Sequence, residues 1–216
     1  MGLAHEGANL VLAGRTSDVL KQVQEAVIAA GVKAEVVITD VTVEKQIETL
    51  FAKTMEVFGR LDILVNNAGV FDAAPIDQMS TETWDKVIAT DLRAPFLCTR
   101  AAFRIMKAQG GGRIINIGSV SAQRVRLHNV AYNTSKFGLV GLTHSTALDG
   151  RKYGINCGVL HPGVTRREGG PSHTNEPSME PEETAAAVVY MACQPPDINV
   201  LELIQLPMEQ LYLGRG

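Results

Sequence analysis

The chain has 216 residues, of which 45% are hydrophobic and 20% are charged, and its formal net charge is −3. These values fit one soluble globular domain over residues 1–216 with a sizeable core. The negative net charge gives no basis for binding nucleic acid, and no apolar stretch is long enough to span a bilayer, so neither partner is expected.

Three cysteines, Cys98, Cys157 and Cys193, are widely spaced and form no CxxC pair. An odd number of scattered cysteines predicts neither a disulfide framework nor a zinc site, so no metal is expected. Residues 1–7 lack the apolar core of a signal peptide. Buried, reduced thiols in a cytoplasmic protein are the favoured interpretation.

Strand-like and helix-like patterns alternate along the chain. In chain order, the expected elements are a strand over 8–13, a helix over 18–30, a strand over 34–39, a helix over 43–58, a strand over 61–65, a helix over 81–109, a strand over 113–117, a helix over 130–153, a strand over 155–160, a helix over 181–193 and a strand over 201–206. Pro95 predicts a kink in the longest helix. The alternation predicts an α/β fold with a doubly wound parallel sheet, covered by helices on both faces.

Residues 166–181 are polar and rich in Gly, Pro and Ser. Such a segment is either a disordered linker or a loop with a function of its own. Because expected elements flank it on both sides, we expect a lid over a substrate site.

Five residues each follow an expected strand: Arg15, Asp40, Asn67, Ser119 and Pro162. In a doubly wound sheet the carboxyl ends of the strands share one edge, and ligands bind there. These five placements predict a single ligand site at that edge.

Tyr132 and Lys136 are four residues apart, so on a helix their side chains share a face. An ammonium close to a phenol favours the phenolate and lowers the tyrosine pKa. Such a phenol can exchange a proton with an alcohol or a carbonyl oxygen, which a hydroxyl such as that of Ser119 would hold. The three residues suit a hydride transfer, in which oxygen exchanges a proton while carbon exchanges a hydride.

These residues stand in a longer pattern, which consists of the run Asn66-Asn67-Ala68-Gly69, then Ser119, then Tyr132 and Lys136, then Pro162-Gly163. In order and separation, the pattern resembles the short-chain dehydrogenase/reductase family over essentially the whole chain. The resemblance implies a Rossmann-like fold and an oxidoreductase that uses a nicotinamide cofactor. It also implies that Tyr132 is the catalytic acid/base, that Lys136 lowers its pKa and holds the nicotinamide ribose, and that Ser119 polarises the substrate carbonyl.

The residues that the resemblance places around the cofactor are Tyr132, Lys136, Asp40, Val41, Asn67, Ala68, Gly69, Pro162, Gly163 and Thr165. Family members often carry a threonine near the nicotinamide carboxamide. Arg167 aligns with that position, so Thr165 is the candidate to serve in its place. Taken singly, these residues have plainer interpretations, such as a helix cap for Asp40 or a simple turn for Pro162-Gly163. Taken together, they favour a cofactor-binding site.

Arg15 follows the strand that ends Leu12-Ala13-Gly14, and no acidic residue accompanies it. In this fold an acid at that place accepts the ribose hydroxyls of NAD, whereas an arginine accommodates the 2′-phosphate of NADP. The sequence therefore predicts NADP(H) over NAD(H). The alternative is a solvent-exposed arginine at a strand end.

The N-terminal region departs from the family pattern. Family members begin with a strand and a glycine-rich turn that leads into a helix, whose N-terminus holds the pyrophosphate. Residues 1–7 instead resemble the tail of that helix, so the first strand is expected to be missing and the domain truncated. Without a central strand, the sheet has either two unpaired inner edges or a direct pairing of the flanking strands. An incomplete chain and a real truncated product are both possible origins.

Asp91 stands where the family usually has an asparagine that holds a water in a proton relay toward the lysine. An aspartate keeps an acceptor oxygen, loses the amide donor and adds a negative charge near Lys136. We therefore count Asp91 among the catalytic group and expect altered pH dependence rather than inactivity.

The leading hypothesis is an NADP(H)-dependent oxidoreductase acting on a small-molecule carbonyl or alcohol. The alternative is a non-catalytic dinucleotide-fold remnant that acts only as an interaction subunit. The helices over 81–109 and 130–153 are those that family members use to assemble, so a homodimer or homotetramer is expected. The substrate is not identified: Arg124, Arg126 and His128 either face a polar group or are ordinary loop residues.

Overall fold

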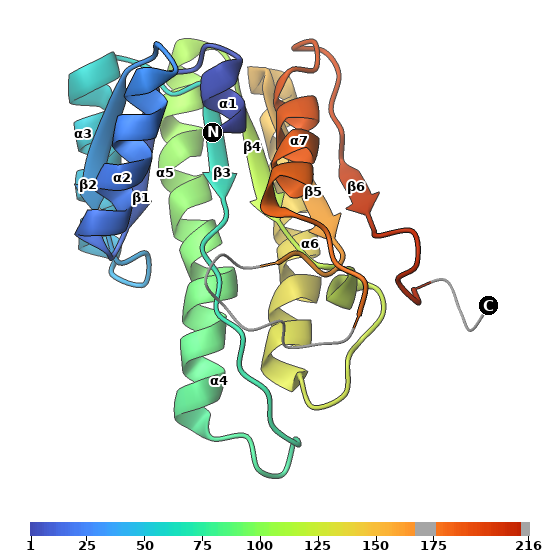
Figure 1. Ribbon diagram of the computed structural model, residues 1–216. Coiled ribbons are helices and arrows are strands. Elements are labelled where there is room, and N and C mark those ends of the chain that lie inside the picture. Colours follow the sequence, from blue (N-terminus) through green and yellow to red (C-terminus); the bar gives the residue numbers. More distant parts are fainter. Residues whose placement is uncertain (167–175, 213–216) are drawn as a thin grey trace.

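The computed structural model describes residues 1–166 and 176–212, and in this part of the chain helices alternate with parallel strands (Figure 1). The strands are β1 (Leu10–Gly14), β2 (Ala34–Ile38), β3 (Ile63–Asn66), β4 (Gly112–Ile117), β5 (Ile155–Pro162) and β6 (Glu202–Gln205). The α-helices are α1 (Gly2–His5), α2 (Ser17–Ala29), α3 (Glu44–Phe58), α4 (Thr81–Ile88), α5 (Ala94–Gln109), α6 (Val130–Gly150) and α7 (Pro181–Ala192). Shorter turns are the π-helical η1 (Ala89–Arg93) and the 3₁₀ segments η2 (Val120–Ala122) and η3 (Arg151–Tyr153).

The described strands form two parallel sheets rather than one. β1 pairs with β2, and a separate sheet has the order β3-β4-β5-β6. β1 and β3 are therefore both edge strands, which confirms the expectation of two unpaired inner edges. The alternative of a direct pairing between these two strands is wrong. Backbone groups along such edges have no strand partner, which weakens this part of the fold.

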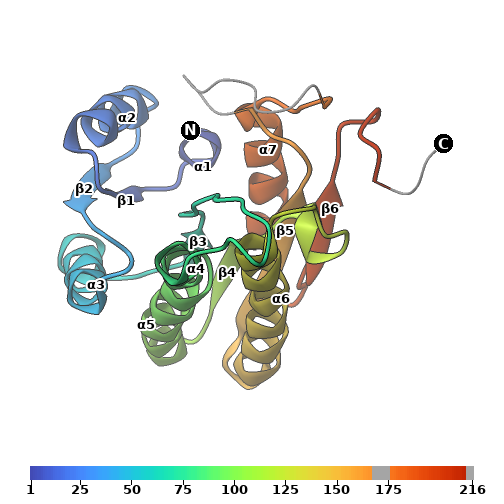
Figure 2. The same ribbon diagram turned by 90° about the horizontal axis from the view of Figure 1, so that it is seen from below.

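Helices cover both faces of the strands, as expected for a doubly wound fold. Seen along the strands in Figure 2, α1, α2 and α7 lie on one side, and α3, α5 and α6 lie on the other. Ala4 of α1 is buried, and α1 packs on α7. Residues 1–7 thus contain a short helix directly before β1, as the sequence predicted.

The larger sheet has a separate apolar core on each face. Ile114 and Ile115 are consecutive in β4 and both fully buried, so they point to opposite faces. Ile114 packs with residues of α3, α5 and β5, whereas Ile115 packs with Leu160 and with α7. β4 and β5 are thus the best-buried of the described strands, and Ser119 follows the end of β4.

The expected helix over 81–109 is divided into α4, the π-helical turn η1 and α5. Pro95, at the start of α5, has no backbone N–H, so it cannot donate to the carbonyl of Asp91 four residues earlier. The sequence predicted a kink near Pro95; the distortion lies just before it and takes the form of a wider turn. π-helical turns within helices are frequent at functional sites.

Other boundaries shift by a few residues. β3 extends to Asn66, α6 ends at Gly150 and β6 is shorter than expected. Cys193 is exposed, so the expectation of buried thiols holds only for Cys98 and Cys157. Most of the expected lid, residues 167–175, lies outside the described residues.

Candidate active site

The C-terminal end of β4 and the first turns of α6 bring three catalytic candidates together. Nζ of Lys136 donates a hydrogen bond to the carbonyl oxygen of Ile117 at 3.1 Å, two residues before Ser119. The same ammonium lies 5.3 Å from the centre of the Tyr132 ring. The structure therefore confirms that Tyr132 and Lys136 share one helix face and that this face meets the strand end.

Ser119 is nearly buried, and its Oγ accepts a hydrogen bond from the backbone N–H of Ser121 at 3.1 Å. Ser119 thereby caps the short η2 turn. Because the hydroxyl acts there as an acceptor, its O–H can still donate to a substrate oxygen.

Tyr132 is half-buried, and its ring meets that of Phe71 edge to face, with 5.2 Å between the ring centres and 73° between the planes. Phe71 belongs to the loop that follows β3. Aromatic pairs prefer this arrangement. The phenol is thus held between α6 and that loop rather than lying free on the surface.

Asp91 lies on η1, fully buried, and contacts two parts of the site. Its Oδ2 lies 3.2 Å from Nζ of Lys136, and its Oδ1 accepts a hydrogen bond from the backbone N–H of Val70 at 2.8 Å. A Cβ on Gly69 would lie 3.3 Å from Oδ2 of Asp91, so the chain after β3 passes close to this carboxylate. Asp91 therefore connects the loop after β3 to the lysine of α6.

Arg15 and Asp40 follow β1 and β2 on the same edge. Arg15 is exposed. Hydrogen bonds from Thr42, one from its hydroxyl and one from its backbone N–H, lower the pKa of Asp40, and the charge of Arg15 acts in the same direction. Asp40 thus stabilises the turn before α3 but does not cap this helix, whose N-cap residue is Val43, and it stays half-exposed at the strand edge.

The remaining cofactor candidates lie on this edge as well. Asn67, Ala68 and Gly69 are exposed after β3, and Val41 is half-buried after β2. Pro162 is the last residue of β5, and Gly163 and Thr165 follow it. The N–H of Gly163 donates to the carbonyl oxygen of Gln205, and Oγ1 of Thr165 lies 2.9 Å from Oγ1 of Thr184. Arg167 lies outside the described residues.

The residues expected to bind a dinucleotide cover its two ends but not its middle. Those expected on the adenosine side and those expected on the nicotinamide side lie along the strand edge. Between β1 and β3, however, the described residues contain no strand and glycine-rich turn that would hold a pyrophosphate.

A buried polar chain that the sequence did not predict lies beneath the site. Nδ2 of Asn66 donates to Oδ1 of Asn116 at 2.8 Å, and Nδ2 of Asn116 donates to Oγ1 of Thr143 at 2.8 Å. These hydrogen bonds connect β3, β4 and α6 through Asn66, Asn116 and Thr143. The sequence did hold a signal for this chain, because Asn66 and Asn116 are polar residues within otherwise apolar strands.

The loop residues between Ser119 and Tyr132 have partners within the protein. Arg126 forms a two-pronged ion pair with Glu176, and the Arg124 guanidinium lies 5.9 Å from the centre of the Tyr212 ring. His128 adopts a left-handed backbone conformation with φ of 62°. The plainer interpretation, ordinary loop residues, fits the two arginines better than a role in substrate binding.

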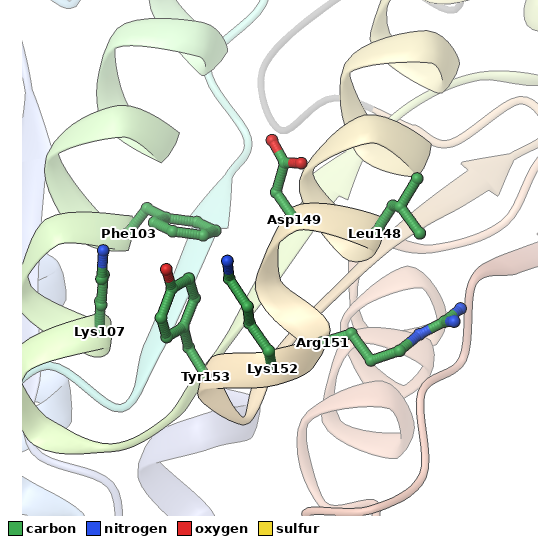
Figure 3. A pocket seen from close by; sticks show the side chains of 7 residues that line it. All are labelled: Phe103, Lys107, Leu148, Asp149, Arg151, Lys152 and Tyr153. Carbon is green, nitrogen blue, oxygen red and sulfur yellow. The ribbon is translucent and has the colours of Figure 1, made fainter.

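A hollow of about 520 Å³ lies at the other end of α5 and α6, where Lys107, Lys152 and Tyr153 converge (Figure 3). Hydrogen bonding and positive charge from the two lysines lower the pKa of Tyr153 below its ordinary value. Tyr153 follows the last turn of α6, about 30 Å along the helix from Tyr132. This second tyrosine and lysine cluster is therefore remote from the strand edge and is not the candidate site.

Within residues 1–166 and 176–212, no group of three or more His, Cys, Asp or Glu side chains is arranged to hold a metal ion. None of the helices in this part of the chain combines the length and the apolar character that crossing a bilayer requires.

A model of the short chain dehydrogenase family matches residues 1–176. The chain is 38% identical over 166 residues to an uncharacterized oxidoreductase of Thermotoga maritima, a match that covers 77% of this chain and 65% of that protein. It is 31% identical over 208 residues to an uncharacterized oxidoreductase of Staphylococcus aureus, with 95% and 89% covered. The chain belongs to the short-chain dehydrogenase family.

Solved structures share the fold. A metagenomic short-chain oxidoreductase in complex with NADP superimposes with a TM-score of 0.85 at 31% identity, covering 96% of this chain and 89% of that one. A gluconate 5-dehydrogenase from Burkholderia cenocepacia, in complex with NADP and tartrate, gives 0.86 at 26% identity, with 94% and 86% covered. The chain is thus a Rossmann-like α/β protein of an NAD(P)-dependent oxidoreductase family. The matched part spans only 65% and 62% of the Thermotoga maritima and Bacillus subtilis relatives.

Proposed function

We propose that this protein is an oxidoreductase that transfers hydride between NADP(H) and a carbonyl or alcohol substrate. The observation that carries the proposal is the position of Lys136. It touches the Tyr132 ring, hydrogen bonds to the strand end that leads to Ser119 and pairs with Asp91. A lysine held on three sides beside a half-exposed phenol is a preorganised arrangement for proton transfer.

The nicotinamide, when bound, supplies the hydride. In the direction of reduction, the Ser119 hydroxyl donates a hydrogen bond to the substrate carbonyl oxygen, and Oη of Tyr132 gives that oxygen its proton. Lys136 stabilises the charge that remains on the phenolic oxygen and orients the ribose. In the oxidation of an alcohol, Tyr132 takes the proton back.

The preference for NADP(H) rests on Arg15. Its exposed guanidinium stands at the carboxyl end of β1, and a planar guanidinium pairs well with a phosphate. The remaining cofactor contacts are assigned to Asp40, Val41 and the turn 67–69 on the adenosine side. On the nicotinamide side they are assigned to Pro162, Gly163 and Thr165, and residues 166–181 are assigned as a substrate lid. NADP in two similar solved structures supports this cofactor.

Assembly through α5 and α6 accompanies this proposal, in a cytoplasmic homodimer or homotetramer. Phe96 of α5 and Phe137 and Leu148 of α6 are large apolar side chains that remain 45–65% exposed. Exposed apolar side chains on neighbouring helices favour an interface. Light scattering coupled to size exclusion tests the assembly.

A non-catalytic interaction subunit is the second candidate, and one observation favours it. The unpaired edges of β1 and β3 flank the place where a pyrophosphate-binding turn would belong. Such a protein would not bind NADPH, so a titration with the cofactor separates the two functions.

Two tyrosine variants test the proposed chemistry. Tyr132→Phe keeps the ring contact with Phe71 and removes the proton donor, so it should lower turnover about 100-fold or more. Tyr153→Phe is the matched control, because Tyr153 also lies between lysines but far from the strand edge. NADPH consumption with a panel of aldehydes and ketones is the measurement. Equal loss in both variants would contradict the assignment.

A further inference from the structure

His161 lies directly behind Ser119 and is completely buried in β5. Its Nδ1 lies 2.9 Å from the carbonyl oxygen of Ser119 and 3.4 Å from the backbone nitrogen of the same residue. A Cβ on Gly118 would lie 2.7 Å from Nδ1, so the imidazole reaches this turn only because residue 118 is a glycine. The ring and the Ser119 turn are in tight contact.

The shorter distance indicates which ring nitrogen carries the proton. A carbonyl oxygen only accepts, so the 2.9 Å contact requires a proton on Nδ1. The opposite tautomer would accept from the Ser119 N–H at 3.4 Å and point its own N–H at Glu202 across 3.5 Å, but it would set two acceptors against each other at the shortest contact, 2.9 Å. The geometry therefore favours the Nδ1–H form.

The other ring nitrogen faces a carboxylate. Nε2 lies 3.5 Å from Oε2 of Glu202 and has no hydrogen-bond partner among the described residues. Glu202 in turn contacts His144, whose Nε2 lies 2.8 Å from Oε1, and Gln123, whose amide donates to Oε2 at 3.4 Å. These contacts form a row that runs from the surface of α6 through β6 and β5 to the candidate active site. Its members are His144, Glu202, His161 and Ser119.

The groups packed around His161 act on its charge in opposite directions. Burial lowers the pKa of His161 most, and the positive charge of Lys136 on α6 acts in the same direction. The Ser119 carbonyl and Glu202 on β6 favour the protonated ring. The ring is therefore neutral at neutral pH and gains its second proton only below its ordinary range, on the nitrogen that faces Glu202.

We propose that His161 is a positioning residue that holds the turn carrying Ser119 through its Nδ1–H, with the Glu202 carboxylate 3.5 Å from Nε2 on the opposite side. This inference rests on the proposed role of Ser119 in the reaction. His161 touches neither substrate nor cofactor. It fixes the direction of the Ser119 hydroxyl by holding the carbonyl of the same residue.

The direct test is the tautomer and titration of His161, read from imidazole ¹⁵N chemical shifts of the full chain without cofactor or substrate. We expect a neutral ring with Nδ1 protonated at neutral pH. In Glu202→Gln the ring should titrate at lower pH, because a charge that favours its protonation is gone. His144→Gln is the matched control: it removes the outer partner of Glu202 and should move the titration much less. A ring protonated on Nε2, or a titration unchanged in Glu202→Gln, would overturn the proposal.

Two substitutions connect the geometry to the reaction. Asn places its amide N–H near the position of Nδ1, whereas Gln places it near Nε2. His161→Asn should therefore keep kcat within about threefold, and His161→Gln should lower kcat about tenfold with little change in the KM for the cofactor. Equal losses in the two variants, with both folded by circular dichroism, would contradict the positioning role. The NMR result stands whether or not turnover is found, so a failure of this inference and a failure of the proposed function are distinguishable.

Discussion

The Lys136 ammonium lies 3.2 Å from the Asp91 carboxylate, and both side chains are almost completely buried. Asp91 also accepts the backbone N–H of Val70, so this carboxylate joins the loop after β3 to the α6 helix. A buried ion pair is sensitive to the loss of either partner, because the remaining charge is left in a poor solvent. The loss of either partner is therefore expected to destabilise this part of the fold.

Asp91→Asn should change the pH dependence of turnover without abolishing it. The amide keeps an acceptor oxygen for Val70 and removes the negative charge beside Lys136, so more of the lysine charge acts on Tyr132. We expect the pH–rate profile to shift toward lower pH, with maximal activity within about tenfold of the original. An unchanged profile would show that Asp91 lies outside the proton relay.

Asp91→Leu should be much more harmful to stability than Asp91→Asn. The leucine removes both the partner of Lys136 and the acceptor for Val70, so we expect a loss of about 3–5 kcal/mol in the free energy of unfolding. Urea denaturation of the two variants side by side is the measurement. Both variants remove the ion pair, so similar losses in both would mean that the retained polar contacts of the amide, including the acceptor for Val70, contribute little to stability.

Arg15→Ala should weaken the binding of NADPH but not that of NADH. Loss of a charge-assisted contact to the 2′-phosphate should lower the affinity for NADPH about 10- to 100-fold, while NADH, which lacks this phosphate, changes by about twofold or less. Arg124→Ala is the control, because Arg124 lies over the Tyr212 ring. An equal loss of affinity for NADPH and NADH would show that Arg15 does not contact the 2′-phosphate.

The three cysteines should react very differently with an alkylating reagent. Burial raises the pKa of Cys98 to about 11 and that of Cys157 to about 12, so both stay protonated at mildly alkaline pH. The thiolate is the reactive form, and Cys193 is exposed. Iodoacetamide should therefore label Cys193 alone in the native protein, as read by mass spectrometry. Labelling of Cys157 at the same rate would contradict its place in the core.

The split between the two sheets should be visible in hydrogen exchange. Amides of β1 and β3 that point away from their single strand partner should exchange much faster than those of β4 and β5, which are paired on both sides. Residue-resolved exchange by NMR measures the difference. Equally slow exchange in β1 and β4 would mean that the β1 edge is covered in solution.

The sequence predicted the strand edge well, because this information is local. A short apolar run followed by Arg15, Asp40 or Ser119 locates the carboxyl end of a strand without knowledge of its neighbours. The same holds for the shared face of Tyr132 and Lys136, which follows from helical spacing alone.

Contacts between distant residues could not be predicted in this way. Asn66 and Asn116 are 50 residues apart, and Ser119 and His161 are 42 apart, so no periodicity connects them. The helix distortion near Pro95 was predicted, but its form, a π-helical turn over Ala89–Arg93, was not. Tertiary packing decides such details.

The central claim is that this strand edge binds a nicotinamide cofactor and uses it. Calorimetric titration of the purified chain with NADPH, and then with NADH, tests the claim most directly. The account predicts saturable binding of NADPH, tighter than that of NADH. The absence of any binding at millimolar NADPH would contradict the account and favour the non-catalytic interaction subunit.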